Sequence, residues 1–497
     1  MKKAKLLLAF LIIASMVLPI AACAKDEGSG TPNDNDAADA TTSAAVDGTT
    51  EEELVSGLPD RDLGGYEFRV ITRDDSMHNY PLHTRDILVD GETGEPLNDA
   101  VYARNKTLEE KYNFTIKMIA LNESDESNPN KALQKSVKAG DDEYDLFLSH
   151  MINGGSSAQA GLLLNWNNIP NIDFTKPWWC EGATQGLSVG DNLFLALSDF
   201  SISSNDHAYV MLFNKKLAQQ YAIEDMYALV NDGKWTFDKF HELLRGVSSD
   251  INGDGVMDAE DQYGYIAGGG QLNYLYAGGA SFTRKDENNI PYIDYVNDHS
   301  VEVFLKTLDI FTSGDNTFSF ESWIDDKIPP MFAANRGLFL STQVGLIPGF
   351  RDMETDFGIL PYPKWNEAQD KYLNYVDGHA QLMGVPLTVE DVDKIGFIIE
   401  ALSFESYKSV RPAYFDTALK TKFSRDVESA AMLDYVFDGR IFDFGYVYDN
   451  WISVFLFNDL INQKKDTFVS SVEKKATQSQ KQLEKVLKTY EELANAV

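Results

Sequence analysis

The densest group of potential metal ligands is an acidic segment of twelve residues, 250–261. Side-chain oxygens occur at its positions 1, 3, 5, 9 and 12, and position 7 supplies a backbone carbonyl, which is the spacing of a calcium-binding loop. Gly255, at position 6, permits the sharp turn of such a loop. The segment therefore predicts a structural calcium ion of the weak extracellular class, with ligands from Asp250, Asn252, Asp254, Val256, Asp258 and Asp261.

Two features separate this segment from an EF-hand. Asp261 stands where the EF-hand has a bidentate Glu, although calcium loops of the dockerin type also end in Asp. Residues 263–266 alternate like a strand, so a pair of helices that opens on calcium binding is not expected. A solvated acidic turn without a metal is the alternative interpretation.

Hydrolytic chemistry has weaker support in the sequence. His241 and Glu242 are followed by Leu, Leu and Arg, which breaks the His-Glu-x-x-His pattern of a zinc helix. Carboxylates are abundant, and a glycosidase needs two of them flanking the scissile bond. Because abundance does not place two carboxylates together, a cell-surface glycosidase is kept as the alternative to a protein without catalytic residues.

The first residues predict export. Three lysines among the first five residues precede an apolar run from Leu6 to Leu18, and Ile-Ala-Ala-Cys follows at 20–23. The run is shorter than the roughly 20 apolar residues that a membrane-spanning helix needs. We predict a signal peptide over 1–22 and lipidation of Cys23, with an uncleaved anchor as the alternative. The protein is then expected on the extracellular face of the cell membrane.

Residues 23–60 are predicted to form a disordered tether. The stretch is rich in Asp, Asn, Thr, Ser, Gly and Ala and has almost nothing to bury. The chain has only two cysteines, so once Cys23 is lipidated no intramolecular disulfide can form, and Cys180 is expected to be a small buried residue. A net charge of −34 makes nucleic acid an unfavourable partner, since phosphate binding relies on Lys and Arg.

The elements that must position these groups alternate along the chain. Residues 66–71, 114–119 and 144–148 have strand patterns, and helical spacing occurs between them at 100–112 and 131–139. This order favours an α/β fold with a parallel sheet, and ligands of such sheets bind beyond the carboxyl ends of the strands. Those ends are at 72–75, 121–123 and 149–153.

A second alternating pattern begins near residue 209. Helices are expected at 237–245 and 301–311, and strands at 263–266, 337–342, 357–360 and ending at 384–386. From residue 389 onward the chain is predicted to be mostly helical, and it ends in an amphipathic helix. One face of that helix consists of Ser479, Leu483, Val486, Leu487, Tyr490 and Leu493.

Several of these segments resemble bacterial extracellular solute-binding proteins of ATP-driven (ABC) importers. The resemblance is to their carbohydrate-type branch and runs from about residue 66 to the C-terminus. It rests on the ordered segments 212–215, 232–238, 250–265, 357–363, 411–414, 425–426 and 432–434. It implies a two-lobed α/β fold of the periplasmic-binding-protein type with crossing strands as a hinge. The lobes would be discontinuous, with lobe 1 over 61–210 and 341–387 and lobe 2 over 211–340 and 388–497.

The resemblance also implies a function. The expected ligand of this branch is small and polar, a mono- or oligosaccharide. It would be captured by lobe closure and passed to the permease subunits of an ABC importer. Closure needs only extra affinity of the ligand for the shut state, so no residue has to act as acid, base or nucleophile. A monomer is expected, and a surface adhesin or sensor with the same cleft differs only in its partner.

Sugar recognition calls for aromatic rings against the apolar sugar faces and for polar groups at the hydroxyls. At strand ends and crossing strands, the expected ligand contacts are Arg73, Asp74, His150, Asn153, Trp178, Trp179, Asp206, Gln343, Asp377 and His379. Trp166, Trp235 and Trp451 are instead expected in the core or on a lobe surface. Trp323 and Trp365, on predicted loops, are weaker expectations for ligand contact.

Overall fold

The computed structural model describes residues 54–76, 83–122, 128–319, 328–415 and 426–494. The predicted signal peptide, Cys23, most of the predicted tether and Trp323 lie outside the described residues. The part of the tether that is described, 54–60, contains no helix or strand. The chain divides into two compact units, Met1–Val55 and Ser56–Val497, and all the described helices and strands belong to the second.

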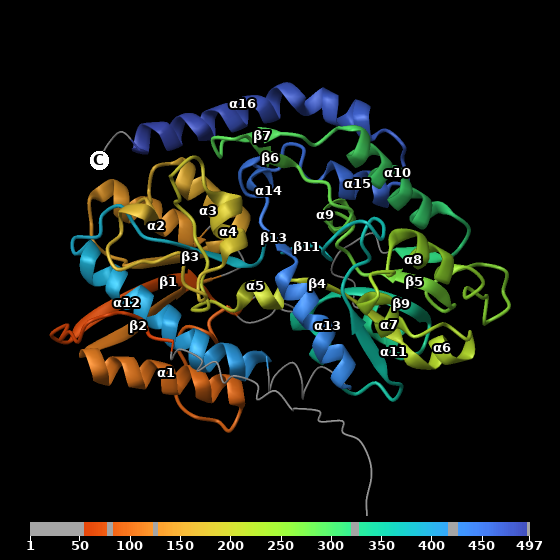
Figure 1. The fold of residues 1–497 in the computed structure, drawn as a ribbon, viewed down its shortest axis with the longest axis horizontal. Coiled ribbons are helices and arrows are strands. Elements are labelled where there is room, and N and C mark those ends of the chain that lie inside the picture. Colours follow the sequence, from red (N-terminus) through yellow and green to blue (C-terminus); the bar gives the residue numbers. More distant parts are fainter. Residues whose placement is uncertain (1–53, 77–82, 123–127, 320–327, 416–425, 495–497) are drawn as a thin grey trace, which may run out of the picture. The chain divides into compact units, whose positions relative to one another are not determined.

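The first sheet has the strand order β12-β3-β1-β2 (Figure 1). β1 (Tyr66–Arg73) pairs in parallel with β2 (Phe114–Leu121) and with β3 (Leu146–His150), whereas β12 (Gln381–Gly384) pairs antiparallel with β3. α1 (Pro96–Tyr112) and α2 (Asn128–Ala139) form the crossovers. The predicted order of strand, helix, strand, helix and strand is confirmed, and the late strand β12 makes the sheet mixed.

Local chemistry defines the limits of α1. The Glu95 side chain accepts hydrogen bonds from the amides of Leu97 and Asn98, and Pro96 occupies the first turn, where no amide donor is needed. Asn113 ends the helix in the left-handed conformation, with φ of 54°. Leu97, Val101, Leu108 and Tyr112 are buried at helical spacing, so one face of α1 packs on the core.

The second sheet has the strand order β10-β4-β9-β5-β8. β4 (Tyr209–Asn214) is antiparallel to both β10 (Phe357–Leu360) and β9 (Gly337–Gln343), while β5 (Tyr263–Ala267) is parallel to β9 and to β8 (Thr317–Ser319). Around it pack α6 (Lys215–Gln220), α7 (Met226–Asn231), α8 (Phe237–Leu244), α10 (Asp298–Thr312) and α11 (Ile328–Ala333). The two sheets are the centres of two lobes.

The lobe boundaries differ from those that the sequence suggests. Residues 341–387 were expected to complete lobe 1, yet the chain runs from β9 through η2 (Val344–Phe350) into β10 of the second sheet and returns to the first sheet only at β12. α12 (Val392–Glu405), expected in lobe 2, packs against α1 of lobe 1. The reason is that strand pairing is a long-range property, which the alternation within one segment does not encode.

Three segments that connect the lobes are hydrogen-bonded to one another. β11 (Asn374–Tyr375) pairs in parallel with β13 (Arg440–Ile441), and Ala208 forms an antiparallel bridge with Val376. The Asp377 amide also donates to the carbonyl of His207 at 3.0 Å. We call these segments, 205–208, 374–377 and 440–442, the connecting ribbon.

The C-terminal part is helical, as predicted. α13 (Val427–Asp438) packs on β10, and α14 (Phe444–Tyr448) packs on α3 (Met151–Gln159) of lobe 1. α16 (Phe468–Ala494) contacts α3, α14, α10 and α15 (Leu456–Asn462), so it touches elements of both lobes (Figure 1). On its predicted face, Ser479, Leu483, Val486 and Tyr490 are buried.

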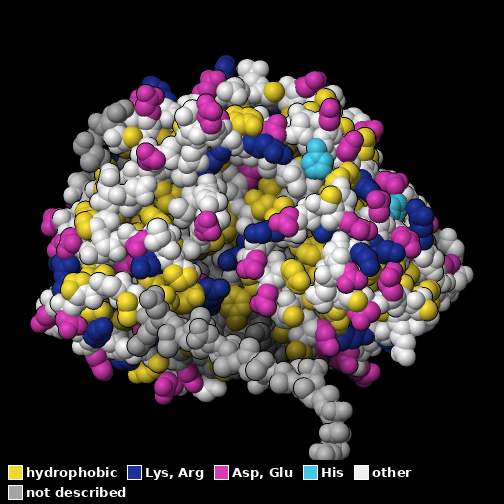
Figure 2. Space-filling model, viewed as in Figure 1, with side chains coloured by type: hydrophobic (Ala, Val, Ile, Leu, Met, Phe, Trp, Pro, Cys, Tyr) yellow, Lys and Arg dark blue, Asp and Glu magenta, His cyan; other side chains and the backbone are white. Residues whose placement is uncertain are grey.

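The smaller elements fill the connections. They are η1 (Trp166–Asn168), α4 (Glu181–Leu187), α5 (Ser203–Asp206), α9 (Asn273–Ala277), β6 (Thr283–Lys285), β7 (Pro291–Ile293) and η3 (Ser406–Val410). Within the described ranges, no helix combines the length and the apolar character that crossing a membrane requires. Acidic side chains are spread over the face seen in Figure 2, consistent with the net charge of −34.

Candidate ligand-binding cavity

A cavity of about 470 Å³ lies beside the connecting ribbon. It meets the carboxyl end of β3 at His150 and the start of β4 at Tyr209, and ribbon residues form part of its wall. Its position beyond strand ends is the one expected for ligands of open α/β sheets. The lining residues are His150, Ile152, Tyr209, Gly269, Gly270, Gln271, Tyr375, Asp377, Gly378, His379, Tyr446, Trp451, Phe455, Asn458, Asp459 and Asn462.

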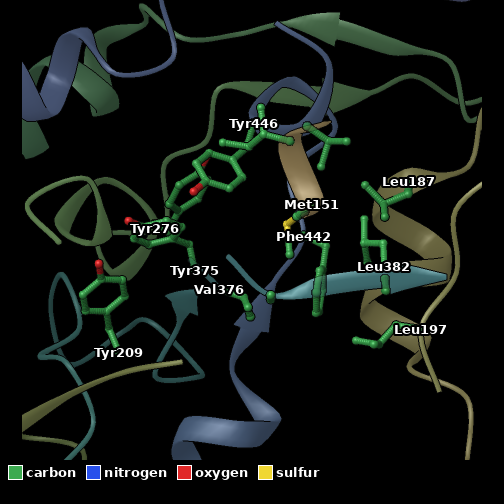
Figure 3. Close-up of a cluster of buried hydrophobic side chains, with 14 of the residues drawn as sticks. Met151, Leu187, Leu197, Tyr209, Tyr276, Tyr375, Val376, Leu382, Phe442 and Tyr446 are labelled. Atoms are coloured by element: carbon green, nitrogen blue, oxygen red, sulfur yellow. The ribbon is translucent and has the colours of Figure 1, made fainter. Parts of the chain in front are cut away.

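Three tyrosines form one wall of the cavity. The rings of Tyr209 and Tyr375 stack at 5.2 Å between centroids, and Tyr446 meets Tyr375 edge to face at 5.3 Å (Figure 3). Tyr276 also stacks on Tyr375, at 5.6 Å between centroids. All four rings are buried, so this wall is packed as tightly as a core and holds its shape without a ligand.

Capping interactions hold Tyr446 in place. Asp443, at the start of α14, accepts hydrogen bonds from the amides of Gly445 at 2.7 Å and Tyr446 at 3.3 Å. The phenol oxygen of Tyr446 in turn accepts a hydrogen bond from the Gly378 amide at 2.8 Å. A Cβ atom at Gly378 would lie 2.8 Å from the end of the Ile152 side chain and 3.0 Å from the Tyr446 hydroxyl, so a larger residue would require these side chains to shift.

Asp377 is the most strongly held polar group of the cavity. Its Oδ2 accepts a hydrogen bond from the Tyr209 hydroxyl at 3.0 Å, and its Oδ1 accepts one from the His379 amide at 3.0 Å and lies 2.6 Å from His379 Nδ1. Burial alone would raise the pKa of Asp377, but the hydrogen bond and charge of His379 outweigh it and lower the pKa to about 2. Asp377 is therefore ionised at neutral pH.

Four of the seven histidines gather behind and beside Asp377. The rings of His150 and His379 meet edge to face at 4.9 Å, and His207 stacks between His379 and His83 at 6.2 and 5.8 Å. Burial lowers the pKa of His150 and of His83 well below the ordinary value. Both rings are accordingly neutral at physiological pH.

A second wall is built by α15 and the turn before it, and it adjoins the tyrosine wall where Phe455 meets Tyr446 edge to face at 5.7 Å. Asp449 closes this turn by accepting hydrogen bonds from the amides of Ser453 at 2.6 Å and Val454 at 3.0 Å. Trp451, in the turn, has a φ of 63°, an uncommon conformation for a bulky residue, and its side chain is 57% exposed. Its indole stacks on Phe455 at 4.6 Å and 21°. An exposed indole held in a strained backbone on a cavity wall indicates a functional site.

The polar residues of α15 share the cavity face with Phe455. Asn458, Asp459 and Asn462 follow Phe455 by three, four and seven positions, which places them on one side of the helix. Partial burial raises the pKa of Asp459. The wall thus presents two aromatic rings next to amide and carboxylate groups.

The cavity brings together part of the set that the sequence suggests. His150, Asp377 and His379 line it, and Gln343 lies directly behind, where its Nε2 donates to the Tyr209 hydroxyl at 3.3 Å. Arg73 is fully buried and donates to the carbonyl oxygen of His379. The remaining five of the ten residues lie elsewhere.

Those five have other partners in the structure. The indoles of Trp178 and Trp179 are buried and donate to the two carboxylate oxygens of Glu400, each at 2.9 Å. Asp206 is buried in an ion pair with Arg85 and accepts a hydrogen bond from Tyr414. Asp74 accepts the Ser76 amide at 3.1 Å, and the carbonyl of Asn153 accepts a hydrogen bond from Asn130 at 2.6 Å. None of the five lines the cavity.

The tryptophans expected in the core or on a surface divide. Trp166 and Trp235 are fully buried, as expected, whereas Trp451 lines the cavity. Trp365 is half-buried under the ammonium of Lys306, 4.8 Å from the ring centroid. Cys180 is half-buried rather than fully buried. Sequence reasoning missed Trp451, Phe455 and the α15 residues, because their helical spacing is also that of an ordinary surface helix.

The acidic segment 250–261 forms a tight loop. Asp250 accepts the amides of Gly253 at 2.6 Å and Gly255 at 2.9 Å, and Asp261 accepts those of Ile251 at 2.9 Å and Asp258 at 3.0 Å. Gly255 has a φ of 80°, as its place in the motif requires. Among the described residues, no group of three or more His, Cys, Asp or Glu side chains converges as a metal site. The calcium ion stays a prediction.

A serine-nucleophile spacing, Gly-x-Ser-x-Gly, also occurs, at 186–190. Its Ser188 follows the helix α4, and its hydroxyl contacts Lys285 Nζ at 3.1 Å and Asn289 Nδ2 at 3.0 Å. A nucleophile elbow needs the serine on a turn from a strand into a helix, with a histidine as base. Neither feature occurs at Ser188.

Comparisons with solved structures agree with this architecture. UspC of M. tuberculosis matches with a TM-score of 0.56 and 15% identity, over 82% of this chain and 98% of that chain. A cyclo/maltodextrin-binding protein complexed with maltotetraose matches with a TM-score of 0.54 and 14% identity, over 88% and 97%. An ABC substrate-binding protein from Listeria monocytogenes, in complex with cycloalternan, has a TM-score of 0.51 and 13% identity, over 86% and 99%.

These similarities establish the fold. The chain has the two-lobed fold of periplasmic-binding proteins, in the form found in solute-binding proteins of ABC importers. Two of these three structures, the cyclo/maltodextrin-binding protein and the Listeria protein, are binding proteins. No protein-family model matches the sequence, and the comparison with curated proteins found no match.

Proposed function

We propose that the protein binds a mono- or oligosaccharide in the cavity beside the connecting ribbon and delivers it to an ABC importer. The observation that carries this proposal is the exposed indole of Trp451, stacked on Phe455 in the cavity wall. A stacked ring pair gives a sugar face a large contact area at little entropic cost. Asn458 and Asn462, on the same helix face, supply hydrogen-bonding groups for sugar hydroxyls.

The size of the cavity agrees with a small ligand. About 470 Å³ lies within the range of roughly 300–1,000 Å³ that is typical of small-molecule sites. Similar solved structures contain maltotetraose and cycloalternan, which supports a carbohydrate for this chain. The predicted signal peptide would direct export, and the lipid on Cys23 would hold the protein, as a monomer, at the extracellular face of the membrane beside the permease.

A glycosidase is the second candidate, since two carboxylates, Asp377 and Asp459, line the cavity. Both oxygens of Asp377 are occupied by hydrogen bonds from Tyr209 and His379, and its pKa is about 2. A carboxylate of that kind holds a wall in place and is unsuited to donate a proton. This arrangement favours binding over hydrolysis.

A sugar panel tests the proposal. Neutral mono- and oligosaccharides are screened by thermal shift. We expect at least one of them to raise the melting temperature and to change the tryptophan fluorescence. The sugar should be recovered chemically unchanged. Stabilisation by a peptide or amino acid but by no sugar would reject the carbohydrate assignment, and release of reducing ends would favour the glycosidase.

A further inference from the structure

The cavity is lined by acidic but by no basic side chains other than histidine. Its lining residues, all of them described, include Asp377 and Asp459 and contain neither Lys nor Arg. Of its two histidines, His150 is neutral because burial lowers its pKa far below the ordinary value. A charged group on a bound sugar would therefore interact electrostatically mainly with these two carboxylates.

The two carboxylates differ in how their charge is compensated. Asp377 lies against His379 Nδ1 at 2.6 Å, and the guanidinium of Arg73 lies behind His379 and donates to its carbonyl oxygen. Among the described residues, Asp459 forms no ion pair within 4.0 Å and no side-chain hydrogen bond, and burial is the only influence on its pKa. Its partial burial raises its pKa, since solvent stabilises the ionised form less there than in open water.

Asp459 also lies next to the aromatic platform. Its amide donates to the carbonyl of Phe455 at 3.0 Å, so the two side chains are one helical turn apart on the cavity face of α15. Because Trp451 covers one face of Phe455, a sugar ring would rest on the exposed indole, in the cavity that Asp459 also lines. Hydroxyl or ammonium groups there are attracted to a carboxylate, whereas a second carboxylate or a phosphate is repelled.

We propose that the cavity takes uncharged or basic sugars and excludes sugar acids, and that Asp459 sets this preference. The inference rests on the proposed function and narrows its substrate class. Asp459 acts here as a specificity-determining residue that contacts the ligand, and the discrimination occurs on the α15 side of the cavity.

Paired ligands test this selectivity. Galactobiose and digalacturonate differ in the oxidation of C6, and cellobiose and its uronic-acid counterpart form a second pair. Dissociation constants are measured at pH 7 and low salt by calorimetry for the wild type, Asp459→Asn and Asp466→Asn. Asp466 is exposed and does not line the cavity, so its variant carries the same change in net charge.

Where the neutral sugar of a pair binds, we expect its affinity to be at least about tenfold higher than that of the corresponding acid. Asp459→Asn should shrink this ratio at least about threefold, 150 mM salt should shrink it partly, and Asp466→Asn should leave it unchanged. Binding of the acid as tightly as the neutral sugar, or an unchanged ratio in Asp459→Asn, would overturn the selectivity alone. If no sugar of a broad neutral panel binds, the proposed function fails and the selectivity fails with it.

Discussion

At the scale of single residues, the two walls of the cavity are built differently. The tyrosine wall is buried and tied together by Asp377, His379 and Gly378, so its shape is set before a ligand arrives. In the second wall, Trp451 is 57% exposed and stacks on Phe455. One wall gives shape, and the other offers contact area.

Replacing Trp451 should weaken binding without unfolding the protein. Trp451→Ala removes the exposed ring of the platform, and we expect the affinity for a bound sugar to fall about tenfold or more. The melting temperature of the unliganded protein should change little, because the side chain is 57% exposed. Tyr292→Ala, which removes an exposed ring outside the cavity, is the control. Equal affinities of the Trp451 variant and the wild type would remove the main support for the sugar site.

Glu400 provides a prediction about pH. Burial raises its pKa to about 7 in spite of the hydrogen bonds from Trp179 and Trp178, compared with an ordinary value of 4.5. The folded state thus binds more protons than the unfolded state between these values, so stability falls as pH rises from about 4.5 through 7. The loss amounts to at most about 3 kcal/mol.

The test compares Glu400→Gln with the wild type in denaturant titrations from pH 4.5 to 8. The variant cannot ionise at this position, so its stability should decline less steeply over that range. Glu390→Gln, which alters an exposed carboxylate, should keep the wild-type slope. Parallel curves for Glu400→Gln and the wild type would mean that Glu400 has no raised pKa.

The sequence predicts the site only where it follows strands. His150 ends β3, and Asp377 and His379 precede β12, so a rule about strand ends finds them. The same rule selects Asp74 and Asn153, which do not line the cavity, although Asn153 follows the same strand as His150. Trp178 and Trp179 have the right chemistry for a sugar, but Glu400, distant in the sequence, draws both indoles into the core. Such partners emerge only from the tertiary fold.

At the scale of elements, prediction works best for local patterns. The strand 357–360 is found with its observed bounds, and the helices at 237–245 and 301–311 are found to within a few residues. The pairing of β10 with β4 is not predictable, since the alternation of Phe357–Leu360 would suit either sheet. The side of α15 that lines the cavity is equally unpredictable from the sequence. The helix contains seven residues, about two turns, which is too short for its spacing to distinguish a cavity face from a surface face.

Calcium binding by the 250–261 loop is a prediction at this scale. Backbone amides bond to Asp250, Asp254, Asp258 and Asp261, and a calcium ion would use the remaining lone pairs of their carboxylates. We expect millimolar calcium to raise the melting temperature of chelator-treated protein by a few degrees. Asp254→Asn together with Asp258→Asn should abolish the shift. If the wild type shows no heat on calorimetric titration with calcium and no thermal shift, the segment is an acidic turn that binds no calcium.

At the scale of the whole molecule, function would depend on a change in the angle between the lobes. A ligand stabilises the shut state only to the extent that it binds that state more tightly. We expect the radius of gyration, measured by small-angle scattering, to decrease when a binding sugar is added. Trp451→Ala at the same sugar concentration should show a smaller decrease. Scattering profiles that are identical with and without a sugar that binds would contradict closure.

The connecting ribbon limits how the lobes can move relative to each other. Its segments are hydrogen-bonded to each other at Ala208 and Val376 and along β11 and β13, so we expect them to bend together as one hinge. A twist of one lobe against the other would break these hydrogen bonds. Tyr375 and Asp377 belong to the connecting ribbon and also line the cavity. Residues on a hinge axis move little as the lobes close. Such residues would contact a ligand already in the open state, whereas residues at the outer edges of the lobes would reach it only on closure.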